Sequence, residues 1–190
     1  MSDQVNESAV LDEEAQEREF ERLDELSAQA GECIKRHCIY AAVGGLVPLP
    51  FVEMITSSTI QLRMIAGLCD VYGVRFSENA VKNAMGTLIA TALPATGVGY
   101  AARSLIRKVP VVGAAFGVVA MPTLAAACTY ALGKVFAWHF AKGGTTTNFK
   151  AEDMKARFME HFEEGKRKAS EFIKGSKKAP ASDASPAAAA

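Results

Sequence analysis

The sequence predicts an all-α protein, a glycine- and alanine-rich helical bundle or hairpin with amphipathic terminal helices, associated with a membrane. Two runs without a charged side chain predict the membrane association. Residues 109–133, as one helix, are long enough to cross a hydrocarbon core of ~30 Å, and residues 84–102 form the second run. At both ends of the chain, charged residues are combined with apolar residues at helical spacing, which predicts amphipathic helices.

Charge is unevenly distributed along the chain, although the formal net charge is +0 at pH 7. Residues 1–32 contain eleven acidic and two basic residues (net −9), residues 33–133 contain three and eight (+5), and residues 134–190 contain seven and eleven (+4). We therefore predict an acidic N-terminal helical arm over 1–32, a helical membrane-associated domain over 33–174 and a disordered tail over 175–190.

The acidic arm is expected to be helical over residues 7–30, with a narrow apolar stripe. We favour a solvated helix packed loosely on its own domain over a coiled-coil or partner-binding role, and both remain open. A second helix over 32–47, weakened by Gly44 and Gly45, is expected to end at Pro48. Proline lacks an amide donor and disfavours helical angles in the preceding residue. The stripe consists of Leu11, Ala15, Phe20, Leu23, Leu26 and Ala30.

The next predicted helix, over residues 51–72, carries the candidate contact surface of the domain. Pro50 suits the first turn of this helix. Glu53, Ser57 and Gln61 follow at i, i+4 and i+8, so they form one polar stripe amid apolar residues. We predict that the stripe faces a partner or a buried polar network. An exposed helix edge is the competing interpretation.

Turn signals and glycine spacing organise the uncharged runs. Gly73 is typical of a helix C-terminus, and Ser77 is typical of an N-cap that opens another helix. In the central run, Gly113 and Gly117 form a GxxxG spacing, which predicts close helix packing. Pro122 is expected to interrupt this run.

Three basic residues, Arg103, Arg107 and Lys108, lie between the two uncharged runs. A plain two-span hairpin with both ends in the cytoplasm would place these bases outside, contrary to the positive-inside tendency. We therefore prefer kinked segments that pack together, dip into one leaflet or insert with the bases at the headgroups.

The C-terminal third begins with an aromatic group around Trp138, which is expected where a helix leaves an apolar zone. Gly143 and Gly144 should break that helix. From Asn148, an expected N-cap, to Ile173 the chain is charged with apolar residues on one side, which predicts an amphipathic helix.

No residue pattern predicts an active site, a cofactor or a metal. Gly133 and Lys134 resemble the end of a phosphate-binding loop, but Val135 stands where Ser or Thr should bind magnesium. Cys33 and His37 share a helix face without a second ligand pair, so we expect no metal site. The bases are dispersed, which argues against nucleic-acid binding. We expect the four cysteines to be reduced and no secretory signal to be present.

Four segments carry a family resemblance: PLPFVEM (48–54), QLRMI (61–65), YGVRFSE (72–78) and YALGKVFAWHFAKGGT (130–145). Over about residues 33–162 the chain resembles a bacterial domain-of-unknown-function family that includes the YcjF-like inner-membrane proteins. The resemblance implies an all-helical module on the cytoplasmic side of the inner membrane, often fused to or encoded beside an Era-like or dynamin-like GTPase. It supplies no catalytic residues. This sequence shows no GTPase domain and no separate N-terminal spanning pair.

Three functions are consistent with these patterns. In the first, a non-enzymatic accessory module, the apolar body lies in or against the membrane while the terminal helices contact a cytoplasmic partner, which the resemblance implies is a GTPase. The second is a membrane-inserting protein whose helices oligomerise to remodel or permeate a bilayer. The third is a soluble all-helical homodimer. We favour the first.

Overall fold

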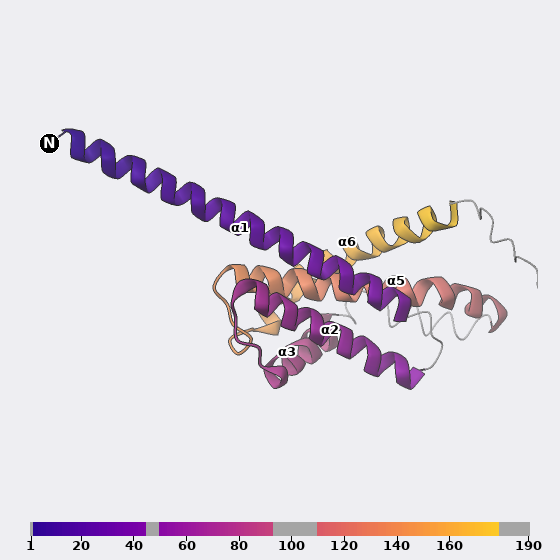
Figure 1. Ribbon diagram of the computed structural model, residues 1–190. Coiled ribbons are helices and arrows are strands. Elements are labelled where there is room, and N and C mark those ends of the chain that lie inside the picture. Colours follow the sequence, from indigo (N-terminus) through magenta and orange to yellow (C-terminus); the bar gives the residue numbers. More distant parts are fainter. Residues whose placement is uncertain (1, 45–49, 93–109, 179–190) are drawn as a thin grey trace, which may run out of the picture.

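The computed structural model describes the backbone of residues 2–44, 50–92 and 110–178, and the side chains of residues 13–44, 58–92 and 122–171. This part of the chain contains five helices and no strand (Figure 1), so the predicted all-α class is confirmed. In chain order the helices are α1 (Ser2–Gly44), α2 (Pro50–Tyr72), α3 (Glu78–Ala92), α5 (Pro110–Ala141) and α6 (Ala151–Lys178).

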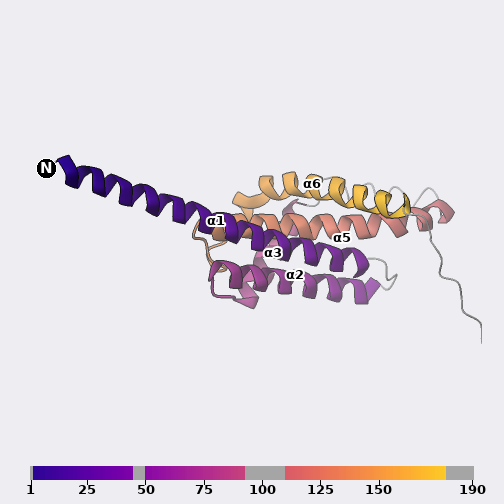
Figure 2. The same cartoon turned by 45° about the horizontal axis from the view of Figure 1, so that its top comes forward.

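α5 is the central helix of the bundle. It packs against α1, α2 and, most extensively, α6, while α3 packs against α6 and α2. Figures 1 and 2 both show α1 and α2 running alongside α5. α5 is suited to this position because its apolar residues are spread around the whole helix. The largest fully buried apolar side chains are Met64, Ile65, Leu68, Val81, Leu88, Leu132, Val135, Phe136, Phe158 and Phe162.

α1 is one uninterrupted helix, whereas separate helices over 7–30 and 32–47 were predicted. The predicted boundary is wrong because a single glycine costs a helix only ~1 kcal/mol, and the exposed Gly31 is tolerated. The C-terminal half of α1 packs against α2 and α5 and buries Ala30 and Ile34.

The N-terminal half of α1 extends away from the bundle in both ribbon views (Figures 1 and 2). Its described side chains over residues 13–29 are exposed, apart from the partly exposed Leu26. Phe20 is 74% exposed. The expectation that this helix packs loosely on its own domain is therefore wrong for these residues.

The end of α2 and the start of α3 follow the predicted turn signals. α2 begins at Pro50 and ends directly before Gly73, which has the positive φ (65°) that glycine tolerates. The amide of Val74 donates to the carbonyl of Cys69 (2.8 Å) and closes the helix end. α3 begins directly after Ser77, as expected for an N-cap residue.

α5 continues through Pro122, which was expected to interrupt it. Proline inside a helix removes one backbone hydrogen bond. Pro122 is buried, and the contacts of α5 with three other helices offset that cost.

α6 begins three residues after Asn148, the predicted N-cap, and extends into the segment 175–190 that was predicted to be a disordered tail. Asn148 instead stabilises the preceding loop. Its Oδ1 accepts hydrogen bonds from the amide of Thr145 (2.7 Å) and from Nε2 of His139 (2.9 Å). These bonds hold the loop between α5 and α6, so the helix starts later than the sequence indicated.

Two glycines allow close approach of the helices. A methyl group on Gly165 of α6 would lie 2.9 Å from Cα of Ala127 on α5. One on Gly133 of α5 would lie 2.7 Å from Cγ1 of Ile34 on α1 and 3.1 Å from Sδ of Met64 on α2. Both positions therefore need the absence of a side chain.

The predicted packing pair, Gly113 and Gly117, lies on α5 in a stretch whose side-chain surroundings are outside the described residues, so its role stays a prediction. Residues 93–109, which include the second half of the first uncharged run and the three bases after it, also lie outside the described residues. Among the residues that the structure describes, no helix is long and apolar enough to cross a membrane.

We expect Gly165→Ala to destabilise the fold, although alanine favours a helix by up to ~1 kcal/mol over glycine. The added methyl group would meet the backbone of Ala127, which cannot move aside as a flexible side chain can, and overpacking costs ~1–3 kcal/mol. Gly31→Ala is the matched control, because it meets nothing within 4 Å and should gain ~0.5–1 kcal/mol. Urea unfolding followed by circular dichroism measures both. A similar gain in the two variants would contradict the close crossing.

Candidate functional site

The predicted stripe on α2 ends inside the bundle. The side chains of Glu53 and Ser57 are outside the described residues, so their contacts stay a prediction. Gln61 is only 5% exposed, and its Nε2 lies 3.9 Å from Sγ of Cys128 on α5, a long and weak hydrogen bond. The interpretation of the stripe as an exposed helix edge is therefore wrong at Gln61, which lies at the contact between α2 and α5.

Four polar side chains link α5 to α6 in the Tyr130 cluster, formed by Tyr130 of α5 and by His161, Glu164 and Lys168 of α6. The Tyr130 hydroxyl donates to Oε1 of Glu164 (2.9 Å) and accepts from Nζ of Lys168 (2.9 Å). Lys168 also lies 2.8 Å from Oε1 of Glu164, and Nδ1 of His161 lies 3.2 Å from Oε2. The cluster thus links α5 to α6 through one carboxylate.

Glu164 is held in its ionised form by these neighbours. The hydrogen bond from Lys168 is the largest cause, with further bonds from His161 and Tyr130, and together they lower the pKa of Glu164 to about 2. The same bond from Lys168 to Glu164 raises the pKa of the lysine. Because each charge is already neutralised within the cluster, we interpret the cluster as a link between helices.

The sequence patterns did not indicate the Tyr130 cluster. His161, Glu164 and Lys168 follow at i, i+3 and i+7, so a shared face of α6 was visible in the sequence. Tyr130 lies 34 residues before Glu164, and only the packing of α5 on α6 brings the two together.

Cys33 and His37 of α1 contact the protein's own backbone. Nδ1 of His37 lies 2.8 Å from the carbonyl oxygen of Cys33, and Sγ of Cys33 lies 3.7 Å from the carbonyl oxygen of Met64. Burial raises the pKa of Cys38 to about 12 and that of Cys69 to about 11, so both thiols are protonated at neutral pH. In the described part of the chain, no group of three or more His, Cys, Asp or Glu residues is placed to hold a metal ion.

An open hollow of about 380 Å³ lies between α3, the loop before α6 and the first residues of α6. Its polar lining consists of Asn83, Thr87, Thr146, Thr147 and Glu152. The hydroxyl of Thr146 is already used, because it donates to the carbonyl of Arg75 (3.1 Å) and holds the loop. Besides the carboxylate of Glu152 and the threonine hydroxyls, the lining contains no histidine, cysteine or lysine.

We expect Glu164→Gln to lower the free energy of unfolding at pH 7 by roughly 1 kcal/mol or less, because the carboxylate is partly exposed and solvent screens it. The folded pKa of Glu164 is depressed, so its contribution is present above the ordinary carboxyl pKa of 4.5 and is lost as the pH falls from about 4.5 to about 2. The difference between wild type and variant should therefore vanish over that interval.

Glu163→Gln is the matched control, since this neighbouring carboxylate is exposed and contacts only Lys166 among the described ion pairs. Unfolding curves across pH 2–8 compare the three proteins. A constant difference between wild type and Glu164→Gln at every pH would contradict the charged link.

We expect Gln61→Met to leave the stability unchanged or to raise it. Replacing a buried amide that has only a weak partner by an apolar side chain of similar length removes a desolvation cost of ~1–3 kcal/mol. Gln61→Ala, which leaves a cavity instead, should destabilise by ~1 kcal/mol or more. Thermal melts of both variants test this. A clear loss of stability in Gln61→Met would indicate that the amide has strong internal partners.

A model of the family described as "Domain of unknown function (DUF697)" matches residues 11–167 of the chain. Magnetosome membrane protein 22 of Magnetospirillum gryphiswaldense is 37% identical to it over 155 residues, which make up 81% of this chain and 78% of that protein. No solved structure matches the chain. The match covers the four segments that carry the resemblance, so that prediction is confirmed. The chain belongs to the DUF697 family.

Proposed function

We propose that the protein is a non-enzymatic, membrane-associated accessory module that binds or anchors a cytoplasmic partner. The observation that carries this proposal is the 37% identity with a magnetosome membrane protein over most of both chains. The family match begins within α1 and ends within α6, so the likeness extends over the bundle. We place the protein at the cytoplasmic side of the bacterial inner membrane, as the family resemblance implies.

The two uncharged runs support a membrane contact. Residues 84–102 and 109–133 carry no charged side chain, and small residues give them faces for close packing. Long uncharged stretches of this composition are typical of segments that contact a membrane. The described residues of the two runs, such as Leu88 and Leu132, lie in the core of the bundle, so this support comes from composition and not from an exposed apolar surface.

The distribution of charge supports a division between a body at the membrane and an arm away from it. Residues 33–133 (+5) and 134–190 (+4) give a body of net charge +9, whereas residues 1–32 carry −9. The anionic cytoplasmic leaflet attracts basic segments and repels acidic ones. The arm would therefore point into the cytoplasm, where a soluble partner can reach it.

We further propose that this partner is a GTPase, as the family resemblance implies. Gly133 and Lys134, the nearest approach of the sequence to a phosphate-binding loop, lie inside α5, and Gly133 is buried. Phosphate binding at a helix uses the free amides of its N-terminus, and these two residues are far from the N-terminus of α5. The nucleotide would accordingly be bound by the partner.

Alkaline carbonate extraction of cell membranes tests the membrane association. We expect the full chain to stay in the pellet at high pH and to be released by detergent, while a cytoplasmic enzyme from the same cells is washed out. Recovery of all the protein in the supernatant without detergent would contradict the proposal.

Chemical crosslinking of the pelleted membranes separates the accessory module from the alternatives. An accessory module should give a product with a second protein, which mass spectrometry identifies as a GTPase or not. A ladder of self-crosslinked products formed only in lipid would favour the membrane-remodelling function. A self-crosslinked dimer in the soluble fraction would favour the homodimer.

A further inference from the structure

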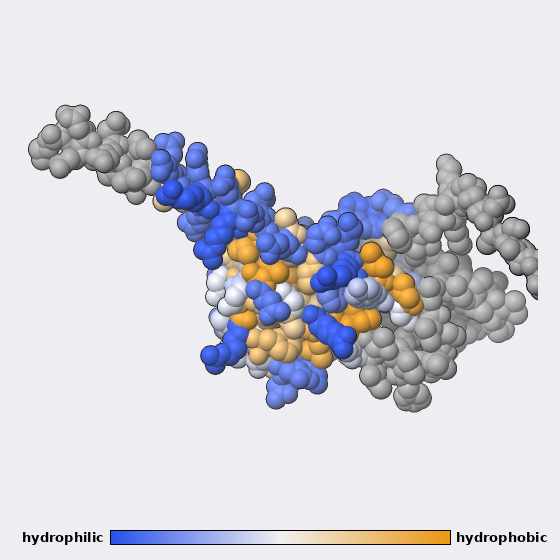
Figure 3. Space-filling view, in the orientation of Figure 1, coloured by the Kyte–Doolittle hydropathy of each residue, from blue (hydrophilic) through white to orange (hydrophobic). Residues whose placement is uncertain are grey.

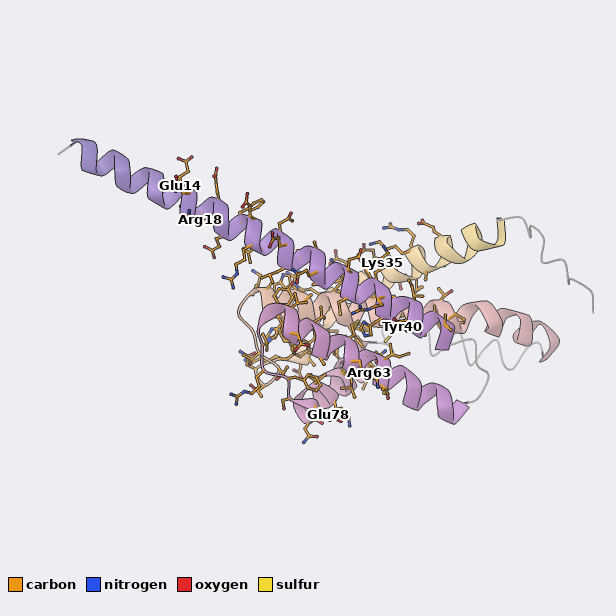
Figure 4. The ribbon with its side chains drawn as sticks, in the orientation of Figure 1. Glu14, Arg18, Lys35, Tyr40, Arg63 and Glu78 are labelled. Atoms are coloured by element: carbon orange, nitrogen blue, oxygen red, sulfur yellow. The ribbon has the colours of Figure 1, made fainter. Side chains whose placement is uncertain are left out.

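The part of the arm with described side chains that extends from the bundle, residues 13–29 of α1, presents an apolar stripe that nothing in the described structure covers. Phe20 is 74% exposed and Leu23 is 46% exposed. Leu26 lies one turn further toward the bundle and is partly exposed. Figure 3 shows the arm as a mainly hydrophilic rod, and Figure 4 labels Glu14 and Arg18, which lie on it beyond the bundle.

This stripe continues the face by which α1 packs on the bundle. The buried residues Ala30, Ile34, His37 and Ala41 are spaced by four, three and four residues. Extending the same spacing toward the N-terminus leads through the exposed Ser27 to Leu23 and then to Phe20. Spacing by three and four is the pattern by which one helix packs along another, so the arm carries an extended helix-packing seam without a described partner.

Acidic residues flank the seam on both sides. Glu17 and Asp24 take the positions next to it on one side, and Glu19 and, seven residues later, Leu26 take the corresponding positions on the other. In paired helices these flanking positions face the partner and decide which partner is accepted. The two bases of the arm, Arg18 and Arg22, take neither seam positions nor the positions next to the seam.

The flanking charges argue against a second copy of the arm as the occupant. In a parallel pair, Glu17 and Asp24 of one copy would face Glu19 of the other, and in an antiparallel pair each flank would face its own kind. Both arrangements oppose like charges. An anionic lipid surface is disfavoured for the same reason.

We propose that the arm binds an amphipathic helix of another protein whose apolar seam packs on Phe20 and Leu23, with Leu26 at their margin, and whose flanking positions carry lysine or arginine. This inference rests on the proposed function in requiring a protein partner, and it adds the binding surface and the chemistry of that partner.

Two synthetic helical peptides test the proposal against the full-length protein. Both have leucine at the seam positions of four heptads, one with lysine and the other with glutamate at the flanking positions. We expect the lysine peptide to bind, with weaker binding as salt rises, and the glutamate peptide not to bind. Fluorescence anisotropy of labelled peptides measures the affinity. Equal binding of both peptides would overturn the charge argument.

Substitutions in the arm locate the site. Phe20→Ser with Leu23→Ser should weaken binding at least ~10-fold, because apolar anchors dominate such contacts. Glu17→Gln, Glu19→Gln and Asp24→Asn together should weaken it by about 5-fold. The matched control, Glu14→Gln with Glu21→Gln and Glu25→Gln, removes the same charge from the opposite face and should stay within about 2-fold. An equal loss in both triple variants, or no loss in the serine variant, would overturn the proposal.

Two further measurements separate this proposal from its alternatives. Sedimentation of the full chain in detergent should give the same oligomeric state for the wild type and the serine variant, and a dimer lost only in the variant would overturn the proposal in favour of a second copy. The serine variant should remain in the carbonate-extracted pellet. If it remains there but binds the lysine peptide as well as the wild type does, the arm proposal fails and membrane association stands. If the wild-type protein binds the peptide but is extracted, the membrane proposal fails instead.

Discussion

Gly165 of α6 lies against the backbone of Ala127 on α5, and this close approach is the constraint on which the rest of the structure depends. On α5 itself, Gly133 lies close to the side chains of Ile34 on α1 and Met64 on α2. Interiors are packed as densely as organic crystals. A methyl group on Gly165 would meet the backbone of α5, and one on Gly133 would force the side chains of Ile34 and Met64 to move. α5 can therefore serve as the shared packing surface for three other helices because small residues are placed where those helices approach most closely.

The Tyr130 cluster lies close to this crossing along α5 and α6, where its polar contacts supplement the apolar packing. Apolar packing alone leaves the rotation of one helix about another weakly specified, whereas a hydroxyl that both donates and accepts must meet its partners in one arrangement. The partly exposed position of Glu164 makes the energetic contribution modest. The main consequence of the cluster is geometric. It favours the rotation of α6 in which Phe158 and Phe162 lie in the core.

The continuity of α1 connects the packing of the bundle to the proposed function. The half that buries Ala30, Ile34 and Ala41 is fixed against α2 and α5, and a continuous helix transmits that orientation to the exposed half. The arm is thus presented in a defined direction, with Phe20 and Leu23 available to a partner. α1 joins the negative arm to the positive body, and the separation of the two charges would let them interact with different neighbours.

The sequence by itself determined the all-α class, the start of α2 at Pro50, its end before Gly73 and the start of α3 after Ser77, because each depends on the backbone chemistry of a few adjacent residues. It also indicated the family, because four sequence segments resemble those of the family in the same order along the chain. Tertiary structure alone decided that α1 passes Gly31 and α5 passes Pro122 without a break, because packing contacts outweigh local costs of a few kcal/mol. It likewise buried Gln61, paired Tyr130 with Glu164 and placed Gly133 and Gly165 at close contacts between helices. These outcomes depend on which helix faces meet across distant parts of the chain, and no local pattern of residues specifies that.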